Sequence, residues 1–143
     1  MQARAIIGAA AKLKKEGNNP KVELMIPLVS NLEEFLNQKE IVLAIKNEIL
    51  EKGDLKINFK IGTMIEVPRA CLVAEEIAEE ADFFSFGTND LTQTTFGFSR
   101  DDTGTFFPHY FDEEIMLADP FEQIDRKGAV SYTHLTLPTI LRV

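Results

Sequence analysis

Two stretches of the chain decide its fold: Gly62-Thr63-Met64-Ile65-Glu66-Val67-Pro68-Arg69-Ala70 and Phe83-Phe84-Ser85-Phe86-Gly87-Thr88-Asn89-Asp90-Leu91-Thr92-Gln93. Each begins with an apolar run typical of a buried strand and continues into an acidic residue, Glu66 in the first and Asp90 in the second. Acids at the ends of neighbouring strands can bind one Mg²⁺ ion, which takes oxygen ligands and commonly one or two protein carboxylates. The two stretches therefore predict a metal-assisted site.

Helices and strands alternate around these stretches. Apolar spacing predicts helices over residues 2–16, from 30 to about 52, over 69–80 and through Leu91, and strands over 22–26, 60–67 and 83–86. Gly17-Asn18 should end the first helix, and Ser30 with Glu33 has the spacing of a capping box. Lys52-Gly53 should end the second helix, and Pro68 suits the first position of the third.

This alternation predicts the α/β class, with parallel strands covered by helices. Such folds place their chemistry at the carboxyl ends of the strands, in a barrel and in an open sheet alike. Three strands are too few to close a barrel of eight. Residues 97–128 lack clear periodicity and read as a long loop rich in aromatic residues, of the kind that is usually functional.

Composition excludes several classes of function. The 143 residues carry a net charge of -8, and no basic run is longer than Lys14-Lys15, so we expect neither nucleic acid nor an anionic membrane as a partner. The longest apolar run, over residues 6–11, is too short to span a bilayer, and we expect a cytoplasmic protein. The single cysteine, Cys71, reads as a small buried residue in a helix rather than a reactive thiol.

Taken one at a time, the candidate residues also have simpler interpretations. Glu66 could be an exposed loop acid, Asn89-Asp90 a helix N-cap pair, and Arg100 part of a surface ion-pair cluster with its acidic neighbours. Arg69 could be a surface charge or a partner of Glu66. His109 and His134 read as structural or incidental.

In combination, the motifs resemble the PEP-utilising enzymes, and in particular their dikinase branch. The resemblance is carried by the two opening stretches, Phe98-Ser99-Arg100-Asp101-Asp102, Glu23-Leu24-Met25-Ile26-Pro27-Leu28-Val29 and Asp119-Pro120-Phe121-Glu122, and it extends over residues 1–128. It implies a partial (β/α)₈ TIM barrel of the PEP/pyruvate-binding type, of which this chain supplies about strands five to seven with their helices.

The resemblance also implies roles for individual residues. Glu66 and Asp90 match the protein ligands of Mg²⁺, and Gly87, Thr88, Asn89 and Asp90 match the loop that holds pyruvate or PEP. Arg100 matches the arginine that binds the transferring phosphoryl group, and with Asn89 it is a candidate catalytic residue. The implied reaction is Mg²⁺-dependent phosphoryl transfer between a phosphohistidine and pyruvate to form PEP.

Other parts of the family pattern have no match in the chain. The general-acid cysteine of a Cys-Gly-Glu-His-Gly type motif on strand eight, the phosphohistidine domain and the nucleotide domain are missing, and Cys71 does not match the motif. Residues 129–143 do not resemble the family, and we expect them to be a foreign C-terminus. In the full enzyme we expect contact with the phosphohistidine domain and a homodimer through the barrel, and we expect the fragment alone to be inactive.

Three alternatives stay open at this point. The first is phosphoenolpyruvate synthase or the phosphotransferase enzyme of sugar transport, from the same superfamily. The second is a metal-dependent aldolase or lyase that acts on pyruvate enolate and needs no Arg100. The third is a non-catalytic remnant or interaction module.

Overall fold

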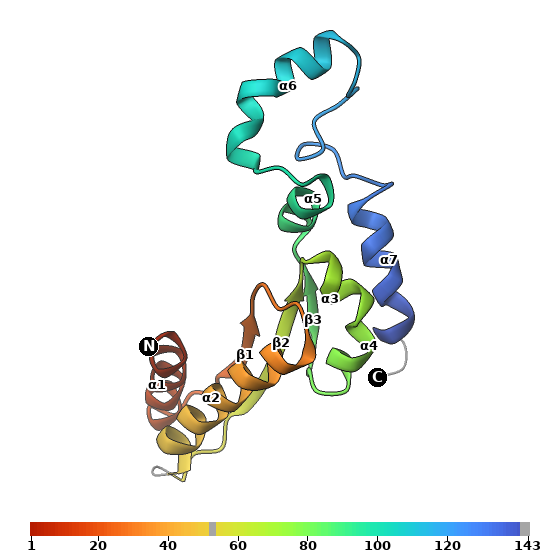
Figure 1. Cartoon of the computed structure of the whole chain (residues 1–143). Coiled ribbons are helices and arrows are strands. Elements are labelled where there is room, and N and C mark those ends of the chain that lie inside the picture. Colours follow the sequence, from red (N-terminus) through yellow and green to blue (C-terminus); the bar gives the residue numbers. More distant parts are fainter. Residues whose placement is uncertain (52–53, 141–143) are drawn as a thin grey trace.

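The computed structural model describes residues 1–51 and 54–140 and contains a parallel sheet of three strands flanked by helices (Figure 1). The strands are β1 (Lys21–Ile26), β2 (Asn58–Ile65) and β3 (Phe84–Phe86), in the order β1-β2-β3. Both neighbouring pairs are parallel. The predicted α/β class is confirmed, and the carboxyl ends of the strands meet at one edge of the sheet.

Helix α1 (Gln2–Lys15) and helix α2 (Leu32–Leu50) pack against each other beside β1 (Figure 1). Gly17 ends α1 as predicted, because its φ of 91° lets the amides of Gly17 and Asn18 donate to the carbonyls of Lys14 and Leu13. The predicted stop of α2 at Lys52-Gly53 lies outside the described residues.

The predicted capping box of α2 is wrong by one residue. The N-cap is Asn31, whose Oδ1 accepts from the Glu34 amide at 2.9 Å. The Glu34 carboxylate, rather than that of Glu33, accepts from the amide and hydroxyl of Ser30, both at 2.7 Å. These Ser30 hydrogen bonds lower the pKa of the Glu34 carboxyl. Asn caps helices as well as Ser does, so spacing alone could not choose between them.

The predicted helix over 69–80 is two short helices, α3 (Pro68–Leu72) and α4 (Ala74–Ala78). Pro68 is the first helical residue as expected, but Val73 leaves helical geometry with φ -112° and ψ 20°. Apolar periodicity could not reveal this break, because the buried residues on either side of it still fall at helical spacing: Ala70, Cys71, Ala74 and Ile77.

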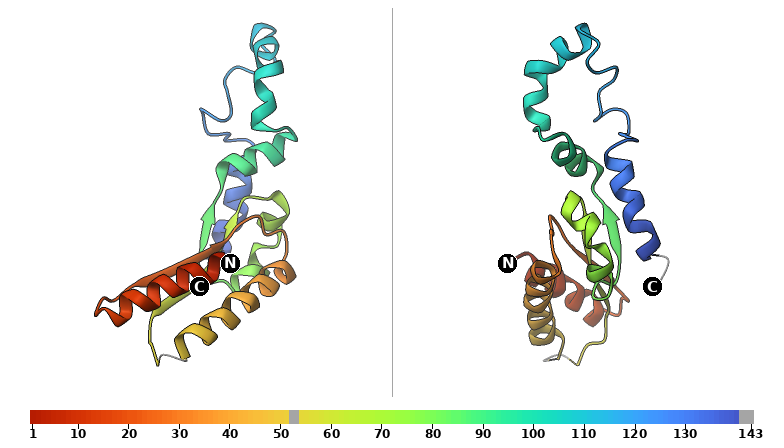
Figure 2. Two further views of the ribbon diagram at one scale, coloured as in Figure 1. Left: turned by 90° about the vertical axis from the view of Figure 1, so that its left-hand side faces the viewer. Right: turned by 45° about the vertical axis from the view of Figure 1, so that its right-hand side comes forward.

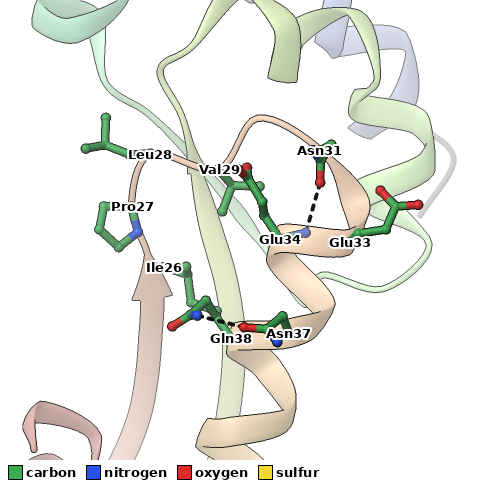
Figure 3. Close-up of a pocket in the computed structure, with 9 residues that line it drawn as sticks. All are labelled: Ile26, Pro27, Leu28, Val29, Asn31, Glu33, Glu34, Asn37 and Gln38. Carbon is green, nitrogen blue, oxygen red and sulfur yellow. Dashed lines mark hydrogen bonds between the residues drawn. The ribbon is translucent and has the colours of Figure 1, made fainter.

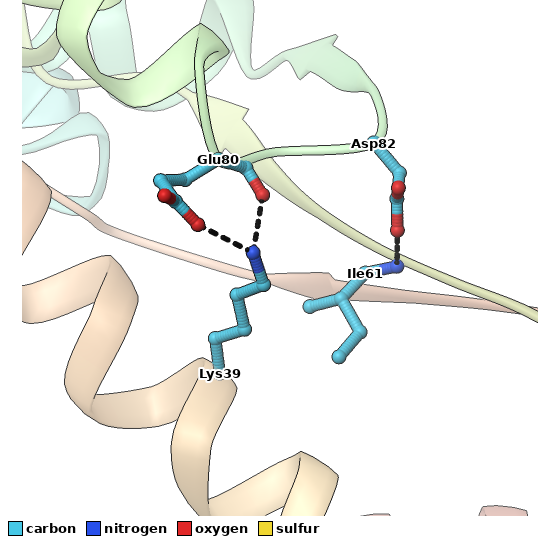
Figure 4. Close-up of polar contacts among 4 residues, drawn as sticks. All are labelled: Lys39, Ile61, Glu80 and Asp82. Carbon is cyan, nitrogen blue, oxygen red and sulfur yellow. Dashed lines mark hydrogen bonds and ion pairs between the residues drawn. The ribbon is translucent and has the colours of Figure 1, made fainter.

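Polar contacts fix the start of β3 beside β2 (Figure 4). Asp82 accepts from the Ile61 amide at 2.7 Å through its carboxylate and donates its own amide to the Ile61 carbonyl at 2.9 Å. Lys39 of α2 binds the carboxylate and the carbonyl of Glu80 at 2.8 and 2.7 Å. In the resulting register Ile65 is opposite Phe86, so Glu66 and Gly87 leave the sheet side by side.

The segment predicted as a loop over 97–128 contains a helix. After α5 (Thr88–Phe96) come a 3₁₀ turn, η2 (Arg100–Asp102), and helix α6 (Thr103–Asp112), which extends away from the sheet (Figure 2). Four aromatic residues of α6 recur at a helical spacing that the sequence interpretation missed, and their rings contact one another: Phe106, Phe107, Tyr110 and Phe111. Pro108 inside this helix made the segment read as irregular.

Residues after Gly128 form helix α7 (Ala129–Ile140), which packs against α3, α4 and α5. The Asp125 carboxylate begins this helix by accepting from the amides of Gly128 and Ala129, both at 3.1 Å. Ala129 and Thr136 are buried. The sequence predicted no helix here, and the foreign origin of residues 129–143 stays a prediction. Among the described residues, no helix combines the length and apolar character needed to cross a membrane.

We predict that Asp82→Ala destabilises the chain by about 1–2 kcal/mol, because the Ile61 amide loses its acceptor at the start of the sheet. Asp82→Asn keeps an oxygen acceptor and should lose less than half of that. Urea unfolding followed by circular dichroism measures both. Equal unfolding midpoints for the alanine variant and the unsubstituted chain would contradict the assigned role.

Candidate metal and substrate site

Glu66 is the first residue after β2, and it is only 3% exposed. Its Oε1 accepts a hydrogen bond from the backbone amide of Leu28 at 2.8 Å. Leu28 has φ 54°, in the left-handed region that a leucine rarely adopts, although its side chain is exposed. The turn after β1 therefore holds a strained backbone whose amide faces a buried carboxylate, and strain of this kind is concentrated at functional sites.

Gly87 follows β3 and lies directly against Glu66. A Cβ atom at this position would overlap Glu66 Oε2 and would lie 2.7 Å from Glu66 Cβ and 2.8 Å from Met64 Sδ. The Gly87 amide donates to the Ile65 carbonyl at 3.1 Å, which extends the pairing of β2 and β3 up to the site. The glycine is needed here for close approach, since any side chain would displace the carboxylate.

Asp90 lies in the first turn of α5, and its carboxyl group interacts with that of Glu66. Burial raises the pKa of the Glu66 carboxyl, the hydrogen bond and charge of Asp90 raise it further, and the Leu28 amide opposes these effects. The fold thus brings together the two acids that the sequence predicted as partners. Asp90 also accepts from Gln93 Nε2 at 3.0 Å.

Thr88 and Asn89 are exposed in the first turn of α5. The N-cap of this helix is Gly87, which has no side chain to satisfy the first amides. The simpler interpretation of Asn89-Asp90 as an N-cap pair is therefore wrong, because both residues lie inside the helix. The amide groups of this turn lie beside the carboxylate pair, at the helix end that favours anions.

Arg100 is exposed at the start of η2. Its guanidinium group lies over the ring of Phe121, 5.4 Å from the ring centroid, and its backbone amide donates to Gln93 Oε1 at 2.7 Å. Among the described residues the ion pairs join other side chains, so the structure gives no support to a surface ion-pair cluster around Arg100.

The other residues considered in the sequence lie outside the carboxylate pair. Arg69 donates to the Ser30 carbonyl at 3.1 Å, which ties α3 to the turn after β1. Cys71 is buried as predicted, and burial raises the pKa of its thiol to about 11, which suppresses the reactive thiolate. His109 on α6 and His134 on α7 are exposed.

Two residues near the carboxylates were given no role by sequence reasoning. Leu28 acts through its backbone amide, which carries no side-chain signal. Gln93 lies three residues after Asp90 on a helix, and this spacing was the sequence signal for a contact between the two.

A pocket of about 510 Å³ opens at the carboxyl end of β1, on the α2 side of Leu28 (Figure 3). Its lining includes Asn31, Glu34 and Gln38, whereas Glu66 and Asp90 do not line it. The pocket is a neighbour of the carboxylate pair rather than part of it.

A metal ion at this site would rest on few protein ligands. Within residues 1–51 and 54–140 there is no group of three or more His, Cys, Asp and Glu side chains placed to hold a metal. Two carboxylates remain, Glu66 and Asp90, and Mg²⁺ commonly uses that number together with water and substrate oxygens. The donor chemistry of the pair fits Mg²⁺.

Comparison with known proteins identifies the family of the chain. The model of the family described as "PEP-utilising enzyme, PEP-binding domain" matches residues 1–130, and the chain belongs to this family. The resemblance seen in the sequence is confirmed.

The relatives include dikinases from plants. The chain is 51% identical over 128 residues to pyruvate, phosphate dikinase 1, chloroplastic, of Oryza sativa subsp. japonica. The aligned region covers 90% of this chain and 14% of the rice protein. It is likewise 51% identical over 128 residues to pyruvate, phosphate dikinase 2 of Zea mays, with the same coverage. The chain thus spans about a seventh of the length of these relatives.

We predict that Gly87→Ala destabilises the chain by about 1–3 kcal/mol, because the added methyl group overlaps the Glu66 side chain. The matched control is Gly8→Ala in α1, where a Cβ meets nothing within 4 Å, and this variant should be more stable by up to about 1 kcal/mol. Urea unfolding reports both changes. A Gly87 variant as stable as the Gly8 variant would show that the close approach is not required.

Proposed function

We propose that this chain is part of the PEP/pyruvate-binding barrel of a pyruvate, phosphate dikinase, and that it supplies about strands five to seven. The full enzyme would convert ATP, pyruvate and phosphate into AMP, PEP and diphosphate. Family membership and about 50% identity to dikinases support the proposal. The observation that carries it is the interaction of Glu66 with Asp90 at the carboxyl edge of a parallel sheet.

Glu66 and Asp90 would hold Mg²⁺ in this proposal. When bound, the ion would supply positive charge to the oxygens of pyruvate and its enolate. The Leu28 amide fixes one oxygen of Glu66, and the absence of a side chain at Gly87 leaves room for the other. Burial and Asp90 both raise the pKa of Glu66, so the ionised form of this carboxylate is disfavoured. A bound cation would stabilise that ionised form.

Substrate would be held beside the pair by α5 and by η2. The exposed first turn of α5, with Gly87 and Thr88, would offer backbone amides to the carboxylate of pyruvate or PEP, and the Asn89 side chain would add a donor. Arg100 has a planar set of donors that suits the oxygens of a phosphoryl group. Its contact with Phe121 restricts the guanidinium group before substrate arrives.

The transfer itself would require little covalent chemistry from these residues. The bond between phosphorus and a histidine nitrogen breaks, and a bond forms between phosphorus and the enolate oxygen of pyruvate. A proton of the pyruvate methyl group would be transferred to the cysteine that the family resemblance places on strand eight. In this step Arg100 and Asn89 would orient the groups, and Glu66 and Asp90 would hold the metal.

The proposal includes partners beyond this chain. The phosphohistidine domain of the full enzyme would deliver the phosphoryl group, and a second subunit would dimerise through the barrel. The 143 residues alone would bind metal and ligand weakly and would not catalyse the reaction. A cytoplasmic location stays a prediction, while the rice relative is named as chloroplastic.

We predict that the chain binds Mg²⁺ and oxalate, a planar mimic of pyruvate enolate, at millimolar concentrations. Isothermal calorimetry measures this binding. Glu66→Gln and Asp90→Asn should each weaken Mg²⁺ binding at least about tenfold, because each removes one charged ligand. Binding should weaken on acidification at a higher pH than for an ordinary carboxylate, since Mg²⁺ needs ionised Glu66 and the pKa of that residue is raised.

The control for this experiment is Glu76→Gln, which makes the same charge change on the exposed side of α4. It should bind Mg²⁺ as the unsubstituted chain does. Absence of heat with millimolar Mg²⁺ and oxalate would contradict the metal site and support a non-catalytic remnant.

The catalytic part of the proposal is testable in a chimera. Residues 1–128 would replace the matching segment of the rice dikinase, and PEP formation from pyruvate would be followed. We expect the chimera to be active, and Arg100→Ala in it to lower kcat at least about a hundredfold, as for loss of a transition-state charge partner. PEP formation that is unchanged by Arg100→Ala would contradict the role of this residue.

A further inference from the structure

Gln93 connects the two ends of the candidate site: the metal end, formed by Glu66 and Asp90, and the arginine end, formed by Arg100. Its Nε2 donates to Asp90 Oδ1 at 3.0 Å, and its Oε1 accepts from the Arg100 backbone amide at 2.7 Å. These two hydrogen bonds form a continuous path from the Glu66–Asp90 pair to the start of η2. Neither the motifs nor the proposed function assigns a role to this residue.

An amide side chain suits both partners, because it carries a donor and an acceptor. A carboxylate oxygen needs a donor, and a backbone amide needs an acceptor, so the orientation of the Gln93 side chain is set by its neighbours. Glutamate would keep the acceptor but lose the donor. Methionine has similar length and offers no strong hydrogen bond to either partner.

The main chain of Gln93 also stabilises the turn that joins α5 to η2. Its carbonyl accepts from the amides of Gly97 and Phe98 at 2.8 and 3.2 Å, which closes α5. Gly97 has φ 74°, and the chain reverses there toward η2. The backbone of Arg100 is thus fixed by Gln93, while its guanidinium group is held by Phe121.

We propose that Gln93 is a positioning residue that couples the Asp90 carboxylate to the position of Arg100. This inference rests on the proposed function, because it concerns how the metal end and the phosphoryl end of that site are held in one geometry. Gln93 touches neither the metal nor the substrate in this role. It transmits the position of one carboxylate to the backbone of the arginine.

The test is a metal-free double-mutant cycle read at the Arg100 amide by ¹H–¹⁵N NMR of the full chain. Asp90→Ala removes the acceptor of Gln93 and should shift the Arg100 amide resonance toward the value for an amide without a hydrogen bond. In a Gln93→Met background the same Asp90 change should leave that resonance in place. This non-additivity defines the coupling.

Other variants keep the cycle informative. Gln93→Glu retains the acceptor, so it should keep the low-field Arg100 resonance but lose the response to Asp90→Ala. Gln38→Met on the exposed face of α2 is the control, and it should leave the Arg100 resonance and its response unchanged. Asp90→Ala shifts of equal size with and without the Gln93→Met substitution would overturn the inference.

A Mg²⁺ titration then separates this inference from the proposed function. We expect Mg²⁺ to move the side-chain resonances of Glu66 and Asp90 and the Arg100 amide, and Gln93→Met to abolish the Arg100 response while weakening Mg²⁺ binding by about tenfold or less. An Arg100 response that persists in the Gln93→Met variant overturns the coupling. If Mg²⁺ moves none of these resonances in the unsubstituted chain, the metal site fails, and the metal-free cycle still decides the role of Gln93.

Discussion

The candidate site depends on a buried carboxylate at the end of the central strand. Glu66 leaves β2 beside the end of β3, and its position is set by the Leu28 amide on one side and by the close approach of Gly87 on the other. Burying an acid beside a second acid is unfavourable, which is why the pKa of Glu66 is raised. In the proposed function, a bound cation would offset this cost by neutralising the pair.

Three separate segments converge on this carboxylate. The turn after β1 contributes the backbone amide of Leu28, and α5 contributes the carboxylate of Asp90. After β3, Gly87 has no side chain and so leaves space for Glu66. Their alignment follows from the parallel register of the sheet, which Asp82 and Ile61 fix at the opposite end. The site is thus a consequence of strand pairing, since a shift in register would move Gly87 away from Glu66.

Much of the scaffold could be predicted because its signals are local. Apolar runs revealed the three strands, Gly17 revealed the end of α1, and Pro68 revealed the start of α3. The failures occurred where a local signal was ambiguous. Asn31 and Ser30 are equally good caps, the break at Val73 preserved the periodicity, and Pro108 concealed the helical spacing of the aromatic residues in α6.

The sequence by itself determined the family, the parallel α/β class and the pair of acids, because residue types and their order suffice for these. Only the tertiary structure decided that Glu66 and Asp90 interact, that a strained leucine amide supports one of them, and that Gln93 joins Asp90 to Arg100. The physical reason is that the Glu66 contacts join segments far apart in the chain, and that the bond from Gln93 to the Arg100 amide depends on how the chain reverses after α5. No side-chain pattern in the sequence encodes that placement directly.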